Sequence, residues 1–187
     1  MERSTVVLDP TSLRALAHPL RVQLLGLLRA DGPSTATALG ARTGESSGTT
    51  SYHLRQLAGA GLVADETGRG NGRERWWRAA QDSTRLDAAG WADEDLPAVR
   101  AYMGAVATTY ARKVAEYLAE EGTYPKRWQR ASTLSDWSLP LTAAELIRLN
   151  EEVEALIESY RRPERKGDEQ VVLQVQAFPR RRRRATP

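Results

Sequence analysis

The sequence predicts a mainly α-helical fold with one small β-hairpin, followed by a second helical region that ends in one short strand. Leucines recur at helical spacing between residues 10 and 60, where Pro and Gly interrupt them. A glycine-rich stretch at 68–73 separates two runs of strand-forming residues. Beyond it, a long apolar stripe at helical spacing occupies 95–121. These patterns predict a first domain at 9–80, a linker at 81–94, a helical region at 95–178 and a disordered, arginine-rich tail at 179–187.

Two helices are predicted at the start of the first domain. Asp9 is suited to the N-cap position and Pro10 to the first helical position, where its missing N–H costs nothing. The pair His18-Pro19 interrupts this helix, and Pro19 begins the next one. Gly32 followed by Pro33 ends that second helix.

A third and a fourth helix follow, joined by a tight turn. Ser34 is the expected N-cap of a short helix that runs to about residue 41, and residues 43–45, Thr-Gly-Glu, form the turn. Ser46 or Ser47 caps the next helix, which Gly61 ends.

The pattern then changes from helix to strand. Residues 62–67 and 75–79 are predicted as two short strands, with the glycine-rich loop 68–73 between them. Neighbouring residues of a strand point to opposite faces, so one of Trp76 and Trp77 is expected in the core and the other partly exposed.

The helical region 95–178 contains more apolar surface than a small domain can cover. Helices are predicted at 95–121 and, from a Thr142-x-x-Glu145 capping box, to about residue 161, with a strand at 171–178. We expect a homodimer that buries the two helical stripes. The residues expected at its interface are Leu96, Val99, Val106, Tyr110, Leu149, Val153 and Leu156.

A short helix, a tight turn and a second helix with small or polar residues at its start form a unit that fits the major groove of DNA. Small side chains permit close approach, and longer ones reach the bases. The glycine-rich hairpin would place basic side chains on phosphates or in the minor groove. The candidate DNA-binding residues are Ser34, Thr35, Ser46, Ser47, Thr49, Thr50, Ser51, Tyr52, His53, Arg55, Gln56, Arg69, Asn71 and Arg73.

Three segments resemble the ArsR/SmtB-type winged helix–turn–helix regulators. They are LRALAHPLRVQLL at 13–25, SYHLRQLAGAGLV at 51–63 and RERWWR at 73–78. The resemblance covers about residues 9–80, and the second segment is similar to the recognition helix of that family. It implies a dimeric DNA-binding repressor, or less often an activator, whose affinity an effector controls.

The chain departs from the metal-sensing members of that family. It contains no Cys, and His18 and His53 are its only histidines. We therefore expect no metal site and no cofactor. No apolar stretch approaches the ~18 residues of a membrane span, so a cytoplasmic, nucleoid-associated protein without a membrane partner is expected. No nucleophile–base pair or phosphate-binding loop indicates an enzyme.

Several interpretations remain open. His53 either contacts DNA or is packed inside the domain. The arginines at 180–184 either bind phosphates or aid solubility. With five charges there, the rest of the chain has a net charge of −2, although the whole chain has +3.

The interpretation of the whole chain also has alternatives. A small-molecule effector would bind near Tyr102, Met103, Trp128 and Trp137, unless the regulator has no such ligand. A winged-helix module that binds proteins instead of DNA is the alternative of another class.

Overall fold

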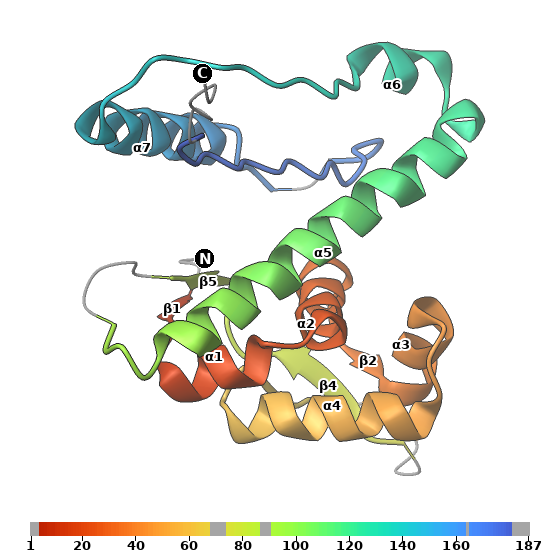
Figure 1. Cartoon of the computed structure of the whole chain (residues 1–187). Helices are drawn as coiled ribbons and strands as arrows, with labels where there is room; N and C mark the ends of the chain where they lie inside the picture. Colours follow the sequence, from red (N-terminus) through yellow and green to blue (C-terminus); the bar gives the residue numbers. More distant parts are fainter. Residues whose placement is uncertain (1–3, 68–73, 87–90, 164, 181–187) are drawn as a thin grey trace, which may run out of the picture. The chain divides into compact units, whose positions relative to one another are not determined.

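The computed structural model describes residues 4–67, 74–86, 91–163 and 165–180, and the chain divides into two compact units, Met1–Glu121 and Gly122–Pro187 (Figure 1). The predicted helical region 95–178 therefore spans this division. Among the described residues, no helix is both long enough and apolar enough to cross a membrane.

The first unit contains five helices and five short strands in its described residues. In chain order they are β1 (Thr5–Val7), α1 (Pro10–Leu16), α2 (Pro19–Asp31), β2 (Ser34–Thr35), α3 (Ala36–Thr43), α4 (Ser47–Gly59), β3 (Val63–Asp65), β4 (Trp76–Ala79), β5 (Ser83–Arg85) and α5 (Leu96–Glu120).

The predicted helix boundaries of α1 and α2 are confirmed. The Asp9 carboxylate accepts a hydrogen bond of 2.7 Å from the backbone N–H of Ser12, and the Ser12 hydroxyl bonds back to Asp9, which completes a capping box. His18 is the N-cap of α2, since its Nδ1 accepts the backbone N–H of Leu20 at 3.2 Å. Gly32 ends α2 with a positive φ of 82°.

The hairpin is present, and a third strand extends its sheet. The order is β2-β4-β3, with antiparallel pairing throughout and Trp77 opposite both Ser34 and Asp65. The expected division between the two tryptophans is confirmed, because Trp77 is 2% exposed and Trp76 is half-buried. The prediction of Ser34 as a helix cap is wrong, because Ser34 lies in β2 and Thr35 caps α3.

A second, two-stranded sheet takes one of its strands, β5, from the segment predicted as a linker. Strand β5 pairs in parallel with β1, so that Val6 lies opposite Thr84. Each strand has three residues, which is too short for a periodic pattern to show in the sequence. The pairing joins the start of the chain to the segment that follows the hairpin.

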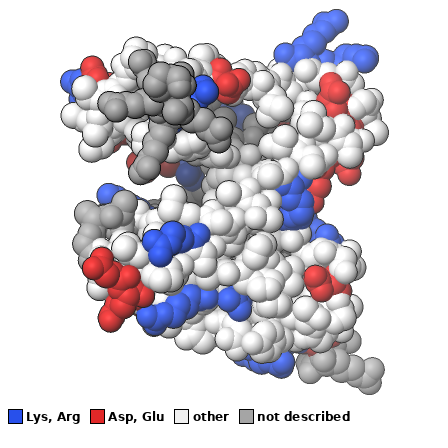
Figure 2. All heavy atoms as spheres, in the orientation of Figure 1, with Lys and Arg blue, Asp and Glu red and all other residues white. Residues whose placement is uncertain are grey.

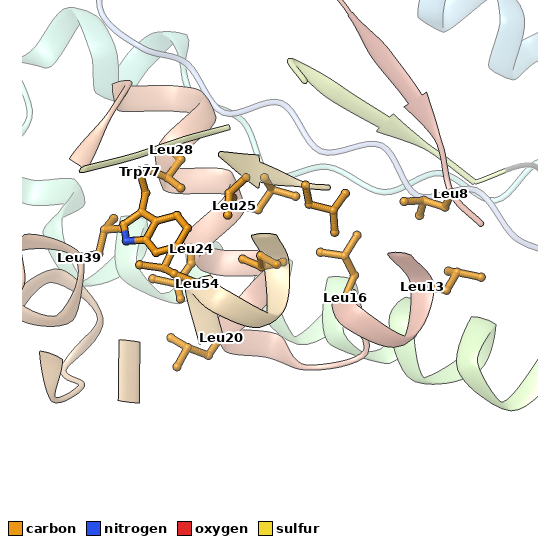
Figure 3. Close-up of a cluster of buried hydrophobic side chains, with 13 residues drawn as sticks. Leu8, Leu13, Leu16, Leu20, Leu24, Leu25, Leu28, Leu39, Leu54 and Trp77 are labelled. Carbon is orange, nitrogen blue, oxygen red and sulfur yellow. The ribbon is translucent and has the colours of Figure 1, made fainter. Parts of the chain in front are cut away.

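One leucine-rich core holds the first unit together (Figure 3). It draws side chains from α1, α2, α3 and α4, and Trp77 of β4 closes it. The buried members are Leu8, Leu13, Leu16, Leu20, Leu24, Leu25, Leu28, Leu39, Leu54, Leu57, Leu62, Val63 and Trp77.

Helix α5 packs across α1 and α2. Its buried side chains are Ala105 and Thr109, and Tyr102 is partly buried against the leucine core. Met103, which the sequence placed on the apolar stripe, is 57% exposed. At the start of the helix, Arg14 forms an ion pair of 2.9 Å with Asp95, which ties α1 to α5.

The second unit contains α6 (Lys126–Ala131) and α7 (Ala143–Ser159), and a 3-10 turn, η1 (Glu121–Thr123), joins it to α5. The predicted capping box of α7 is confirmed, because Thr142 and Glu145 exchange backbone and side-chain hydrogen bonds. The predicted strand at 171–178 is wrong, since those residues belong to no strand. A strand requires a second strand to pair with, and no strand in the described residues pairs with this segment.

Gly40 of α3 provides a test of how tightly the unit is packed. A Cβ added there would lie 2.7 Å from the backbone oxygen of Glu45 and 3.1 Å from the Thr50 hydroxyl, whereas one at Gly26 of α2 would meet nothing within 4 Å. Gly40→Ala should therefore lower the free energy of unfolding by about 1–3 kcal/mol. Gly26→Ala should raise it by about 0.5–1 kcal/mol. Urea unfolding of both variants measures this difference, and equal effects would contradict the close approach at Gly40.

Candidate nucleic-acid interface

Helices α3 and α4 form a helix–turn–helix whose geometry is fixed by local hydrogen bonds. The Thr35 hydroxyl accepts the N–H of Ala38 at 3.2 Å and begins α3. Gly44 ends α3 in the left-handed conformation, at a φ of 72°, which lets the chain reverse. The Ser46 hydroxyl then accepts the N–H of Thr49 at 3.0 Å and begins α4. Figure 1 shows α4 beneath α1 and α2, beside α3.

Helix α4 has one buried face and one exposed face. Thr50, His53, Leu54 and Leu57 point into the domain. The exposed side chains include Tyr52, which is 52% exposed. The sequence-predicted residues on the exposed face are Ser46, Ser47, Tyr52, Arg55 and Gln56, with Thr49 and Ser51 half-buried.

Three candidate DNA-binding residues are corrected by this burial. Thr35 is 6% exposed and caps α3, and Thr50 is fully buried, where its hydroxyl donates to the Ser46 carbonyl at 2.9 Å. His53 is 8% exposed. Their side chains stabilise the motif from within, because one side of any helix packed on a core must face that core. Ser34 is half-buried in β2.

A hollow of about 280 Å³ lies between the starts of α3 and α4 and strand β4. It brings together Thr37, Ser47, Ser51, Arg55 and Arg75, with Thr35, Ala36, Glu74 and Trp77 as its other lining residues. Thr37 and Arg75 were not among the sequence-predicted residues. The position of Thr37 in the first turn of α3 could have indicated it, whereas the contribution of Arg75 depends on the pairing of β2 with β4.

Arg75 is held in place by two neighbours. Its guanidinium lies over the Trp77 ring, 4.1 Å from the ring centre, and it forms an ion pair with Asp65 across the β3–β4 hairpin. The hydrogen bond from Arg75 lowers the pKa of Asp65, and the same bond raises the pKa of Arg75. Arg78 makes a parallel contact of 3.2 Å with Glu66. The predicted wing residues Arg69, Asn71 and Arg73 lie outside the described residues.

On the face of the molecule that Figure 2 draws, the charged side chains do not gather in one large patch. On the face drawn in Figure 2, groups of Lys and Arg alternate with groups of Asp and Glu, and most of the surface is uncharged. This distribution agrees with the net charge of −2 that remains without the terminal arginines.

Two histidines connect α4 to the start of α2: His53 lies in α4, and His18 caps α2. The rings of His18 and His53 are 4.5 Å apart, and Tyr52 meets His53 edge-on at 5.2 Å. The Nδ1 atom of His53 is buried and has no hydrogen-bond partner among the described residues. Burial is the main cause that lowers the pKa of His53; His18 and Arg21 lower it further, and Glu45 opposes them. Burial therefore favours the neutral form of His53.

The other predicted site residues are distributed over both units. Tyr102 and Met103 belong to the first unit, and Trp128 and Trp137 belong to the second, where Trp137 is 79% exposed. In the first unit, Leu96, Val99, Val106 and Tyr110 are half-buried; in the second, Leu149 and Val153 are half-buried and Leu156 is 60% exposed. Within the described residues, no three His, Asp or Glu side chains gather closely enough to hold a metal ion.

The lowered pKa of His53 predicts that folding weakens in mild acid. Below about pH 6.5 the unfolded chain binds a proton at residue 53 that the folded chain does not bind, so the free energy of unfolding falls as the pH drops towards the folded-state pKa. His53→Gln should show a smaller loss of stability between about pH 7.5 and about pH 5.5 than the native chain. Denaturant unfolding at both pH values measures it. The same pH dependence in both proteins would contradict the neutral state of His53.

Comparisons with known proteins agree with this geometry. Residues 16–66 match the family model of a helix-turn-helix domain. No curated protein matches the chain significantly.

Three solved structures are similar to the chain. The first is the homodimeric winged helix-turn-helix DNA-binding domain, fragment 1–100, of a possible ArsR-family transcriptional regulator from Mycobacterium bovis; it is 25% identical, with 57% of this chain and 77% of that chain covered and a TM-score of 0.34. A crystal structure of fragment 1–100 of a possible transcriptional regulatory protein from Mycobacterium bovis is 30% identical, with coverages of 52% and 88% and a TM-score of 0.34. A possible transcriptional regulator for arsenical resistance is 30% identical, with coverages of 56% and 94% and a TM-score of 0.33.

The family-model match covers α2, α3, α4 and β3. The β3–β4 hairpin that follows α4 adds a wing to this motif. Residues 16–66 therefore form a helix-turn-helix domain, and the hairpin beside it gives the domain a winged helix–turn–helix fold.

Proposed function

We propose that this chain is a sequence-specific DNA-binding regulator that acts as a homodimer, most simply as a repressor, on the nucleoid in the cytoplasm. The observation that supports it best is the exposed face of α4. Its Ser47, Tyr52, Arg55 and Gln56 side chains project from a helix whose other face is fixed in the leucine core. A rigid helix with a polar outer face is what the major groove accepts.

The residues of this face divide by chemistry into two roles. Arg55 and Gln56 are long enough to reach base edges, where Arg suits guanine and Gln suits adenine. The hydroxyls of Thr37, Ser47 and Ser51 line the same hollow as Arg55 and are short, so they suit phosphate oxygens. The hydrophobic contacts of Leu54 and Leu57 with the core resist any rotation of α4 that would exchange these roles.

The wing and the terminal arginines would add contacts that do not depend on sequence. Arg69, Asn71 and Arg73 follow or lie between glycines, and residues 180–184 are five consecutive arginines. Guanidinium groups in such sequences suit phosphates or the minor groove, where contacts carry little information about the base. We therefore propose that the wing and the terminal arginines increase the affinity for DNA, and that α4 determines which DNA sequence is bound.

Two arguments support the proposed homodimer: the two-fold symmetry of most operators, and the similarity to a Mycobacterium bovis domain described as homodimeric. We propose that Leu96, Val99, Val106 and Tyr110 on α5 contribute to the subunit interface. Two α4 helices would then enter successive major grooves about 34 Å apart. Helix α5 packs on α1 and α2, and these two helices pack on α4. Only one layer of helices therefore separates the proposed subunit interface from α4.

Regulation would act on that subunit arrangement. A small molecule bound near Tyr102 and Met103 on α5, or near Trp128 and Trp137 in the second unit, must favour one arrangement over the other in order to change DNA affinity.

The DNA-binding role is tested by selecting random duplexes with the full chain and then measuring variants on the selected site. Gln56→Ala should weaken binding to that site by about 1–3 kcal/mol and leave binding to a scrambled duplex almost unchanged. Thr50→Ala is the internal control. Its hydroxyl is buried, so it should lower stability and leave specificity intact. Failure to select any sequence, or equal losses on both duplexes for Gln56→Ala, would contradict readout by α4.

The proposed dimer interface is tested by introducing charged residues into it. Val106→Glu with Tyr110→Glu should convert the protein to monomers, because the substitutions bury carboxylates in an apolar contact. The matched control is Ala107→Glu with Ala111→Glu, which has the same spacing on exposed positions of α5 and should remain dimeric. Light scattering at micromolar concentration gives the mass. A native monomer, or dimers in both double variants, would contradict the assignment of this stripe.

A further inference from the structure

The second unit has almost no core of its own. None of its described residues, 122–163 and 165–180, is buried. Large apolar side chains are instead open to solvent, and Trp137, Phe178 and Val171 are 79%, 75% and 70% exposed. Leaving such surface in water costs about 25 cal/mol for each Å². The unit therefore requires a partner surface.

One segment of this unit has the properties of a strand without being one. Residues 170–179, QVVLQVQAFP, contain no charged side chain and are rich in the β-branched residues that favour strands. Residues 171–178 belong to no helix or strand. Val171, Leu173, Val175 and Ala177 alternate with the rest of the segment, so in a strand they would form one apolar face. An uncharged strand-forming segment outside any sheet is a template for pairing with another chain.

We propose that residues 171–178 pair with the same residues of a second copy of this chain, as an antiparallel two-stranded ribbon centred on Gln174. In that register Leu173 lies opposite Val175 of the second copy, and Val171 lies opposite Ala177 of the second copy. Antiparallel partners share a face of the sheet, so all eight odd-numbered side chains lie together. A shift by one residue would mix these side chains with Gln174 and Gln176 and lose that face.

The charges at the ends of the segment favour the same register. Glu169 precedes it and Arg180 follows it, whereas the carboxylate of Asp168 is already held by Arg162 at 2.6 Å. Antiparallel pairing centred on Gln174 brings the acidic end of one copy beside the basic end of the other at both ends of the ribbon. Parallel pairing would instead place like charges together, which destabilises cross-strand pairs. The chemistry of the segment thus favours a second copy of itself over a partner of another kind.

Helix α7 can cover one face of the ribbon. A hollow of about 480 Å³ lies beside α7 and is lined by Val153 and Ile157 of the helix together with Val175 and Ala177 of the segment. Its other lining residues are polar or charged: Asn150, Glu154, Glu158 and Arg161. The odd-numbered face therefore already shares a space with the apolar stripe of α7. Side chains from the second copy would fill that space, and two strands with two helices would give the unit the core that one copy lacks.

The inference rests on the proposed homodimer and is tested by disulfide formation in the full chain, which has no cysteine of its own. Three glutamines of the segment supply matched sites: Gln170→Cys, Gln174→Cys and Gln176→Cys. Residue 174 would face itself across the two-fold axis, within the reach of a disulfide. At about 3.4 Å per residue, the two copies of residue 176 would be about 14 Å apart and those of residue 170 about 27 Å apart. Mild oxidation should link Gln174→Cys at least about tenfold faster than the other two variants.

Each outcome of this experiment supports or overturns the pairing. Rapid linkage of Gln174→Cys alone, at a rate independent of protein concentration, supports it. The fastest linkage at residue 170 or 176 overturns the register, and equal or absent linkage at all three overturns the pairing itself. Light scattering and DNA titration of the reduced variants separate the two proposals. A dimer that binds the selected duplex without linking at residue 174 refutes the pairing alone, whereas a monomer refutes the homodimer as well.

Discussion

The packing of this domain depends on one constraint. Helix α3 closely approaches the turn before α4 at Gly40. The backbone of Gly40 accepts the N–H of Glu45 at 2.9 Å, and the Thr50 hydroxyl lies where a Cβ of residue 40 would meet it. This contact sets the angle between the two helices. Because α4 is fixed in that way, its buried face meets the leucines of α1 and α2, and its other face remains available to a ligand.

The same side chains that build the core also orient the polar site. Trp77 closes the core from β4 and supports the guanidinium of Arg75 with the face of its ring. Its strand pairs with β2, which leads directly into the cap of α3 at Thr35. The hollow at the starts of α3 and α4 is therefore lined by elements whose positions the core determines. Rigid support of this kind is what specific recognition requires.

Local chemistry made much of this architecture predictable from the sequence. Asp9, Ser46 and the Thr142–Glu145 pair are capping residues whose effect depends on their nearest neighbours, and all of them begin helices where expected. Strands β1, β2 and β5 escaped prediction because two or three residues show no period, and their pairing partners lie far away in the chain. The burial of Thr50 and His53 could not be predicted either. Polar residues occur on both faces of α4, so the sequence of the helix does not show which of them face the core. For residues 171–178 the intrinsic preference was strand, but a preference needs a neighbouring strand before it becomes structure.

The ion pairs of the hairpin have a consequence for how the domain meets a polyanion. Arg75 and Arg78 are each engaged by a carboxylate, Asp65 and Glu66 respectively. A phosphate that approaches either guanidinium competes with a negative charge that belongs to the protein itself, so the contact gains less than a contact with an unengaged arginine would gain. A displaced carboxylate stays attached to the protein near the phosphate, and the two like charges then repel each other. Selectivity at this edge then depends on which anion has the better geometry, and less on the ionic strength of the surrounding solution.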